Sequence, residues 1–305
     1  MPSTDRLVPA QPSARAIAVR WMNVGHALVL RGDAAALAAA LDAYGEAVAL
    51  LRGVARGADA AVDNSLGAAL MNRGQLLHRL RGTAGAGEAL ACLDEAESAL
   101  APVAAPEQSW PRRNLAGTRL NRANLRLDLD QPAHARRDAE AALALVARAG
   151  RDDVIDAELA LKARRALCDA IGRELPTFDA VGQDALAAHA SDVVDDALDL
   201  CAHWAGRGEA RFSALALRFV RFGAGLYRRH QPQFLLEFLR EAAAAAPAHA
   251  AEIRQLVHET LEAALADGAQ PGHFALGDAA TERALAIRRD LTAARAAGLE
   301  LSPLT

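Results

Sequence analysis

The sequence predicts an all-α fold, an α-α superhelix of antiparallel helix pairs, and three observations lead to this prediction. Hydrophobic residues make up 52% of the 305 residues but aromatic residues only 4%, and the excess is alanine with leucine, the best helix formers, and valine. No stretch alternates β-branched or aromatic residues with polar ones, as a strand does. One short pattern recurs at a fixed interval, which is typical of stacked helical hairpins.

The recurring pattern is an apolar residue, an asparagine, one further residue, a small residue and then a polar one. It occurs in three segments, Trp21–Leu28, Met71–Leu77 and Leu120–Leu125. Their asparagines, Asn23, Asn72 and Asn121, follow one another at intervals of 49 residues. A helical hairpin cannot bury its apolar face alone, so we expect three stacked helix pairs that share one continuous core.

In the first pair, the first helix is predicted from Ala16 to Arg31. Gly32 suits the left-handed position after a helix, and Asp33 suits the position that caps the next one. The second helix carries an apolar stripe at helical spacing, formed by Ala40, Tyr44, Ala47 and Leu51. The segment 52–60, broken by two glycines, connects this pair to the second.

The second and third pairs repeat this organisation. In the second pair, helix-compatible residues 66–80 precede a glycine-rich loop over 81–87, and the linker over 101–111 contains three prolines. In the third pair, the two helices are separated by a turn at 130–132. The stripe of the second helix recurs 49 residues later in the second pair and a further 46 residues later in the third, as Ala89, Leu93, Ala96 and Leu100 and then Ala135, Ala139, Ala142 and Val146.

Small residues recur where the helices of each pair are expected to cross. Larger side chains at these places would push the two helices apart. We expect the small residue of each first helix to face an alanine across the turn, in the pairs Gly25 with Ala40, Gly74 with Ala89, and Ala123 with Ala135.

After residue 150 the sequence keeps the periodicity of helices, although the repeat is no longer regular. Helices are predicted over 154–172, 183–204, 211–229, 233–246, 248–267 and 278–297, separated by glycine or proline breaks. The predicted organisation is a disordered tail over 1–14, three helix pairs over 15–150, and degenerate helical repeats with a polar capping helix over 151–305. The segment 215–242 is a candidate degenerate repeat.

The three pairs resemble tetratricopeptide repeats, and the first pair is the most similar. Its Trp21, Asn23, Gly25 and Ala27 are followed by Gly32-Asp33 and then by the stripe of the second helix, in the order of that family's pattern. The units are longer than the family's usual ~34 residues, and the usual proline after the second helix is missing from the first and third. The resemblance covers residues 15–150 and implies a concave groove lined by the first helices.

The resemblance places a candidate binding site for another protein or peptide in that groove. The family's ligand-contacting positions correspond to Met22, Asn23 and His26, then Met71, Asn72 and Gln75, then Leu120, Asn121 and Asn124. Amides can bond an extended peptide backbone while apolar residues accept its side chains. The alternative is that the asparagines only bond a neighbouring helix.

One subtype of the family grips C-terminal carboxylates with lysine, asparagine and arginine. Asn72 matches its central asparagine, but Met22 and Asn121 stand where that subtype carries basic residues. Nearby arginines at 73, 79, 119 and 122 are an alternative source of positive charge, although solvent-exposed faces or pairs within the helix are more usual for such arginines.

No catalytic or metal-binding pattern occurs in the sequence. It lacks a GxSxG elbow, a phosphate-binding loop, an HExxH motif and a dinucleotide fingerprint. Cys92, Cys168 and Cys201 form no CxxC pair, so we expect buried thiols. We therefore expect no enzymatic activity, metal or cofactor.

Net charge and hydropathy limit the classes of partner that the sequence is expected to bind. The formal net charge is −4 with both signs interspersed, so neither nucleic acid nor an anionic membrane is an expected partner. We expect no membrane insertion, because no apolar run approaches the ~20 residues that span a bilayer, and no secretory leader, so the expected compartment is the cytoplasm. Oligomeric state stays open.

A second candidate site is the segment 211–230, which interleaves arginine with aromatic residues. Such a pattern can bind nucleic acid or acidic peptides. The alternative is that its aromatics are core residues and its arginines form the exposed face of one amphipathic helix.

The sequence thus predicts a non-enzymatic interaction scaffold that binds a partner peptide or helix in the groove. The alternative is a helical-repeat regulator that closes around a small ligand or signalling peptide, which predicts compaction on binding.

Overall fold

The computed structural model describes residues 13–230 apart from 55, 56 and 58, together with separate residues between 235 and 259. The described part of the chain is all-α and contains no strand, as the sequence predicts. The chain divides into two compact units, residues 1–170 and 171–305, which are described separately. The predicted tail up to residue 12 and the predicted helices after 230 lie outside the continuously described residues.

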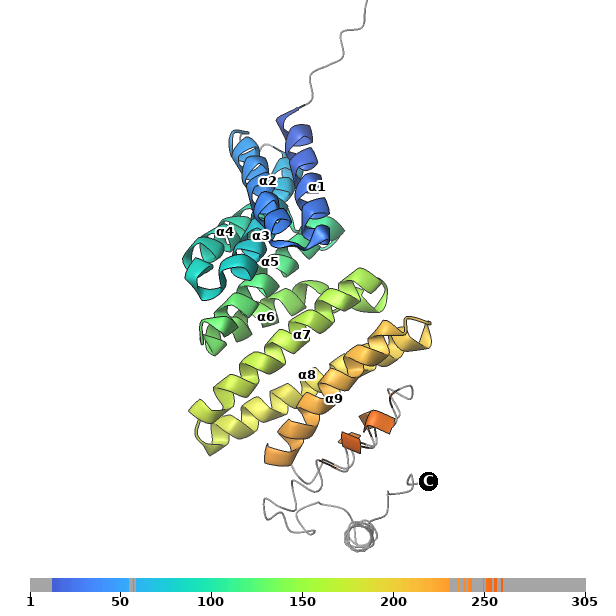
Figure 1. Cartoon of the computed structure of the whole chain (residues 1–305). Helices are drawn as coiled ribbons and strands as arrows, with labels where there is room; N and C mark the ends of the chain where they lie inside the picture. Colours follow the sequence, from blue (N-terminus) through green and yellow to red (C-terminus); the bar gives the residue numbers. More distant parts are fainter. Residues whose placement is uncertain are drawn as a thin grey trace, which may run out of the picture. The chain divides into compact units, whose positions relative to one another are not determined.

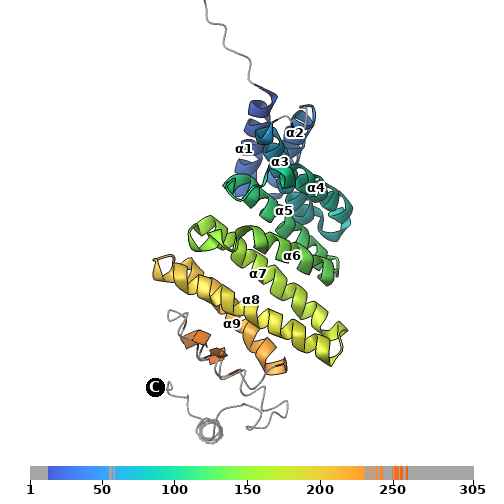
Figure 2. The same ribbon diagram turned by 180° about the vertical axis from the view of Figure 1, so that it is seen from behind.

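The first unit consists of consecutive helices joined by short turns (Figures 1 and 2). The helices are α1 (Ala14–Arg31), α2 (Ala34–Arg52), α3 (Ala60–Arg81), α4 (Ala86–Leu100), α5 (Ser109–Asp128), α6 (Pro132–Val146) and α7 (Val154–Glu174), the last of which runs into the second unit. Short 3-10 helices, η1 (Gly82–Gly85), η2 (Ala101–Val103) and η3 (Ala149–Arg151), lie between them.

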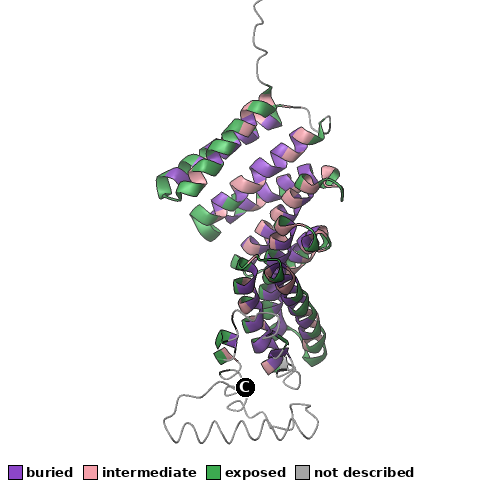
Figure 3. Cartoon of the chain, turned by 90° about the vertical axis from the view of Figure 1, so that its right-hand side faces the viewer, coloured by how far each residue is buried: buried purple, intermediate pink, exposed green. Residues whose placement is uncertain are grey.

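Consecutive helices of this unit pack as three adjacent pairs, α1 with α2, α3 with α4, and α5 with α6. The second helix of a pair packs against the next first helix, as α2 does on α3 and α4 does on α5. The first helices also contact one another, α1 with α3 and α3 with α5. Buried residues run as stripes along the helices, and exposed residues occupy their outer sides (Figure 3).

The predicted helix breaks are formed by the residues that the sequence indicates. Gly32 ends α1 with a φ of 75°, a left-handed conformation that glycine adopts without strain. Asp33 then caps α2, because its Oδ1 accepts a hydrogen bond from the Ala36 N–H at 2.8 Å. The predicted loop over 81–87 is shorter than expected, because η1 occupies most of it and α4 begins at Ala86.

Close helix crossings are present at two of the three predicted places, Gly25 and Gly74. A Cβ added at Gly25 would lie 2.8 Å from the Tyr44 ring, so Tyr44 is the nearest side chain to Gly25. A Cβ at Gly74 would lie 3.0 Å from Leu93 Cγ and 3.2 Å from the Ala89 carbonyl oxygen. Tyr44 and Leu93 occupy equivalent repeat positions, so the two crossings are built in the same way.

A second crossing recurs about two helical turns from the first and was not predicted from the sequence. A Cβ at Gly67 would lie only 2.3 Å from Leu100 Cγ. The equivalent positions in the other pairs again combine a small residue with a larger one. These buried sets are Ala18, Gly67 and Ala116 on the first helices and Leu51, Leu100 and Val146 on the second helices.

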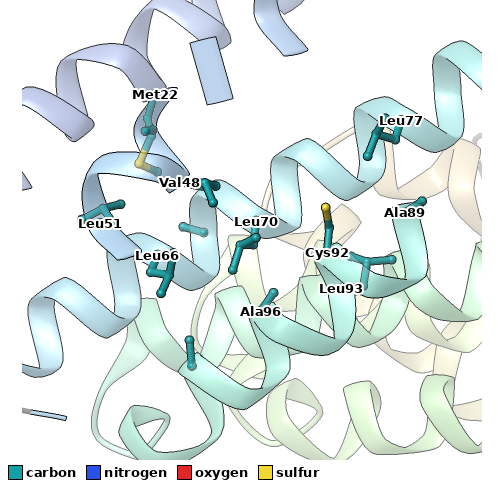
Figure 4. Close-up of a cluster of buried hydrophobic side chains, with 14 of the residues drawn as sticks. Met22, Val48, Leu51, Leu66, Leu70, Leu77, Ala89, Cys92, Leu93 and Ala96 are labelled. Carbon is teal, nitrogen blue, oxygen red and sulfur yellow. The ribbon is translucent and has the colours of Figure 1, made fainter. Parts of the chain in front are cut away.

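The core of the first two pairs is continuous between them. Met22 from α1 and Val48 and Leu51 from α2 join Leu66 and Leu70 from α3 in one buried cluster (Figure 4). The side chains of Leu51, Leu66 and Leu70 have no exposed surface. Burying such leucines is worth about 1.5–3 kcal/mol each, so the cluster is the main source of cohesion between the pairs.

Helix α2 is, by length and composition, apolar enough to cross a membrane, contrary to the expectation that no segment of the chain is. Its apolar stripe is nevertheless used inside the unit. Ala40, Tyr44, Ala47 and Leu51 are all buried, and α2 packs against both α1 and α3. These contacts are those of a core helix.

The second unit contains η4 (Leu175–Thr177), α8 (Ala180–Gly206) and α9 (Arg211–His230), and α8 packs against α9. The aromatic residues Phe212, Phe219 and Tyr227 of α9 are buried, whereas Arg218 and Arg221 are exposed. The prediction that the aromatics of 211–230 are core residues and the arginines form an exposed face is therefore confirmed for these residues.

The crossing at Gly67 makes a testable prediction about stability. We expect Gly67→Ala to lower the free energy of unfolding by about 1–2 kcal/mol, because overpacking against Leu100 outweighs the gain in helix propensity. The matched change Gly45→Ala, at a helical glycine with no atom within 4 Å of an added Cβ, should raise it by about 0.5–1 kcal/mol. Urea unfolding measures both, and equal effects would show that the crossing tolerates a larger residue.

Candidate functional site

The candidate site is carried by the first helices α1, α3 and α5, which hydrogen bonds hold in register. Arg15 Nε donates to Ser65 Oγ at 3.3 Å, from α1 to α3. Asn114 Nδ2 donates to Asn64 Oδ1 at 2.9 Å, from α5 to α3. Both contacts join residues 50 positions apart, so the α1–α3 and α3–α5 contacts are equivalent.

A third contact of this spacing lies further along α3. His78 Nε2 lies 2.7 Å from Asp128 Oδ2, again 50 positions away. A Cβ at Gly117 would lie 3.0 Å from Met71 Sδ. Asn64, Met71 and His78 recur every seven residues, which places them on one stripe of α3 that faces α5.

Two of the predicted site residues meet directly. His26 Nε2 lies 3.1 Å from Asn72 Nδ2, which connects α1 to α3 across 46 positions. The His26 ring also stands edge-on to Tyr44, with 5.7 Å between ring centroids. The alternative that Asn72 bonds a neighbouring helix is thus realised for this asparagine.

The repeat places equivalent polar residues on α5. Gln75 and Asn121 lie 49 residues after His26 and Asn72, and therefore occupy the equivalent positions on α3 and α5. Gln75 lies four residues after Met71 and three before His78, within the stripe that faces α5. We call Asn23, His26, Asn72, Gln75, Asn121 and Asn124 the polar row.

Most of the polar row has unused hydrogen-bonding groups. Asn23 and Gln75 are exposed, and Asn121 and Asn124 are half-buried. Within the described residues, the side chains of these four amides form no hydrogen bond. Each carries a carbonyl acceptor and two N–H donors, so the row can bond both groups of a peptide backbone.

The apolar residues of the predicted site have different positions. Met22 is only 9% exposed and belongs to the buried cluster, so it contributes to the core and not to the exposed face. Met71 is half-buried and packs against the same cluster. Leu120 is buried. Apart from the exposed part of Met71, the accessible surface of the predicted site is therefore polar.

Three of the four nearby arginines, at 73, 119 and 122, are paired with carboxylates from other helices, whereas Arg79 is exposed. Arg122 donates to both oxygens of Asp138 at 2.7 and 3.0 Å, and Arg119 donates to Glu97 at 2.8 Å. Arg73 donates to Glu88 at 2.8 Å. These pairs run between helices, not within one as the sequence suggested.

These pairings shift the pKa values of the groups involved. Burial acts to lower the pKa of Arg122, but its bonds to Asp138 and the neighbouring carboxylates more than reverse this and raise it. Burial acts to raise the pKa of Glu97, and the guanidinium groups of Arg119 and Arg122 outweigh it, so the pKa is lowered. The charges of Arg119 and Arg122 are therefore neutralised locally by these carboxylates.

The cysteines are buried and free, as predicted. Burial raises the pKa of the Cys92 and Cys168 thiols, which keeps them protonated and unreactive at neutral pH. No three His, Cys, Asp or Glu residues converge on a metal-sized site within the described part of the chain.

Comparison with known proteins found no matching family model and no matching curated protein.

The second unit carries a group of carboxylates on α8. Partial burial and the charges of Glu241, Asp192, Asp196 and Asp199 raise the pKa of Asp195 to about 6. A carboxyl group whose pKa is higher in the folded state favours folding when protonated. Its contribution is therefore favourable at low pH and is lost as the pH rises through about 6.

We expect Asp195→Asn to raise the thermal midpoint of the full chain at pH 8, where it removes this repulsion, and to change it little at pH 4. The matched change Asp184→Asn, about three turns earlier on α8, should show no such pH-dependent difference. Thermal unfolding followed by circular dichroism at both pH values measures this. The same gain from Asp195→Asn at pH 4 and pH 8 would contradict the raised pKa.

Proposed function

We propose that the first three helix pairs form a tetratricopeptide-like solenoid segment, and that it binds an extended peptide of a partner protein along the polar row. The protein would act as a non-enzymatic interaction scaffold. The observation that supports this most is the presence of accessible, unbonded amides at equivalent positions on adjacent first helices.

The repeat supports the solenoid part of the proposal. The crossings at Gly25 and Gly74 are built alike, and inter-helix hydrogen bonds recur at a separation of 50 residues. Units that contact their neighbours through the same positions stack by a constant rotation, which produces an extended binding surface.

The chemistry of the row favours recognition of a peptide backbone over a terminal carboxylate. Amides offer donors and acceptors without charge. Arg119 and Arg122 are held by Glu97 and Asp138, and no basic residue stands at 22 or 121. The affinity for the peptide would then depend only weakly on salt concentration, because salt screens interactions between exposed charges and the amides are neutral.

Selection of peptides from a random library on the full-length protein, followed by affinity measurement, tests the proposal. We expect Asn121→Ala and Gln75→Ala each to lower the affinity for a selected peptide by about 5- to 15-fold, which is the effect of losing one or two hydrogen bonds. Gln131→Ala, an exposed residue in the turn before α6, is the matched control and should change nothing.

The affinity of a selected peptide should also change less than about threefold between 50 and 300 mM salt, as expected for recognition by neutral amides. Peptides that bind equally well to the Asn121→Ala and Gln75→Ala variants would place the binding site elsewhere on the protein.

A further inference from the structure

A pocket in the second unit is separate from the polar row. Its volume is about 630 Å³, within the range of about 300–1,000 Å³ that is usual for small-molecule sites. Among the described residues, its lining comes from the end of α7, η4, the start of α8 and α9. These described lining residues all belong to the second unit.

One face of α9 gives the pocket its shape. Arg221, Gly225 and Arg229 recur every four residues, so they lie in one row along the helix. A Cβ added at Gly225 would meet no atom within 4 Å, so the glycine leaves open space between the two arginines. Both arginines are exposed.

The remaining wall of the pocket is largely apolar. Leu175, Pro176, Phe222 and Leu226 line it, and a Cβ at Gly172 would lie 3.5 Å from the Phe222 ring. The Gln183 side chain is held by a 2.9 Å hydrogen bond from its Nε2 to the Phe178 carbonyl oxygen, which fixes a polar group at the rim.

The charge of the lining is positive. It contains Arg221, Arg228 and Arg229 and, among the described lining residues, no carboxylate. Arg228 already interacts with another part of the protein, and Arg221 lies near enough to Glu252 to help lower the pKa of that carboxyl, after its backbone hydrogen bond and His249. Arg229 is therefore the main charge available to a ligand.

We propose that this pocket binds a small organic oxyanion, a compound with one carboxylate, sulfonate or phosphate group attached to an aliphatic or aromatic body. The anionic group bonds Arg229, because guanidinium groups bind oxyanions through paired N–H donors. The body occupies the space above Gly225 against Phe222 and Leu175. Such a site suits a regulator that senses a small molecule.

The probe for the test is 1-anilinonaphthalene-8-sulfonate, which combines an oxyanion with an aromatic body and fluoresces when bound. We expect saturable binding of one molecule to the full-length protein. Arg229→Ala should weaken it about tenfold or more, the effect of losing a charge-assisted hydrogen bond. Arg218→Ala, an exposed arginine of α9 outside the pocket, is the control and should leave it unchanged.

Gly225→Leu is a steric test that does not depend on charge. Leucine is a better helix former than glycine, so the variant should fold. Because leucine fills the open space, the variant should no longer bind the probe. The matched change Gly45→Leu on α2 should leave probe binding intact. Binding that survives both Gly225→Leu and Arg229→Ala would overturn the proposal.

Competition identifies the ligand class. We expect 4-phenylbutanoate to displace the probe at a concentration at least tenfold lower than two controls. Inorganic phosphate has the anionic group without the organic body, and 4-phenylbutanol has the organic body without the charge. Equal displacement by phosphate or by the alcohol would contradict the two-part ligand. Displacement by hexaglutamate at lower concentration than 4-phenylbutanoate would make the site one for acidic peptides and overturn the inference.

Discussion

The close approach of the two helices within each pair is the constraint on which the first unit depends. Glycine at 25, 67 and 74 lets a large side chain of the partner helix lie directly against the backbone, with Tyr44, Leu100 and Leu93 in those places. These crossings recur at equivalent positions of the repeat, and the inter-helix hydrogen bonds of Arg15 with Ser65 and of Asn64 with Asn114 do so as well.

Buried ion pairs hold the third pair to the segments around it. Asp156 is 1% exposed and accepts bonds from Arg112 at 2.9 Å and from Arg113 at 3.0 Å, and Arg112 also donates to the Leu145 carbonyl oxygen. Loss of one partner from a buried pair typically costs about 3–5 kcal/mol, because the other charge stays buried. Within the third pair, Asp138 of α6 accepts bonds from Arg122 and Arg126 of α5 and joins these two helices.

The sequence predicted much of the fold because helix breaks and apolar stripes are local signals. Gly32-Asp33 and the stripe that includes Tyr44 were placed correctly. The contact of Gly25 with the Tyr44 ring was not predicted, because a repeat gives the register along each helix but not the rotation of one helix against the other. For the same reason the burial of Met22 was missed. The pocket at Gly225 was not predicted, because it joins segments distant in the sequence.

The most direct test of the account is photo-crosslinking of the full-length protein to a selected peptide, with the photoreactive residue p-benzoylphenylalanine placed on first or second helices. We expect adducts from position 75 on α3 and position 124 on α5. We expect none from the exposed positions 49 on α2 and 91 on α4. Adducts from 49 and 91 but not from 75 and 124 would show that the peptide binds the face formed by the second helices, and would contradict the proposed site.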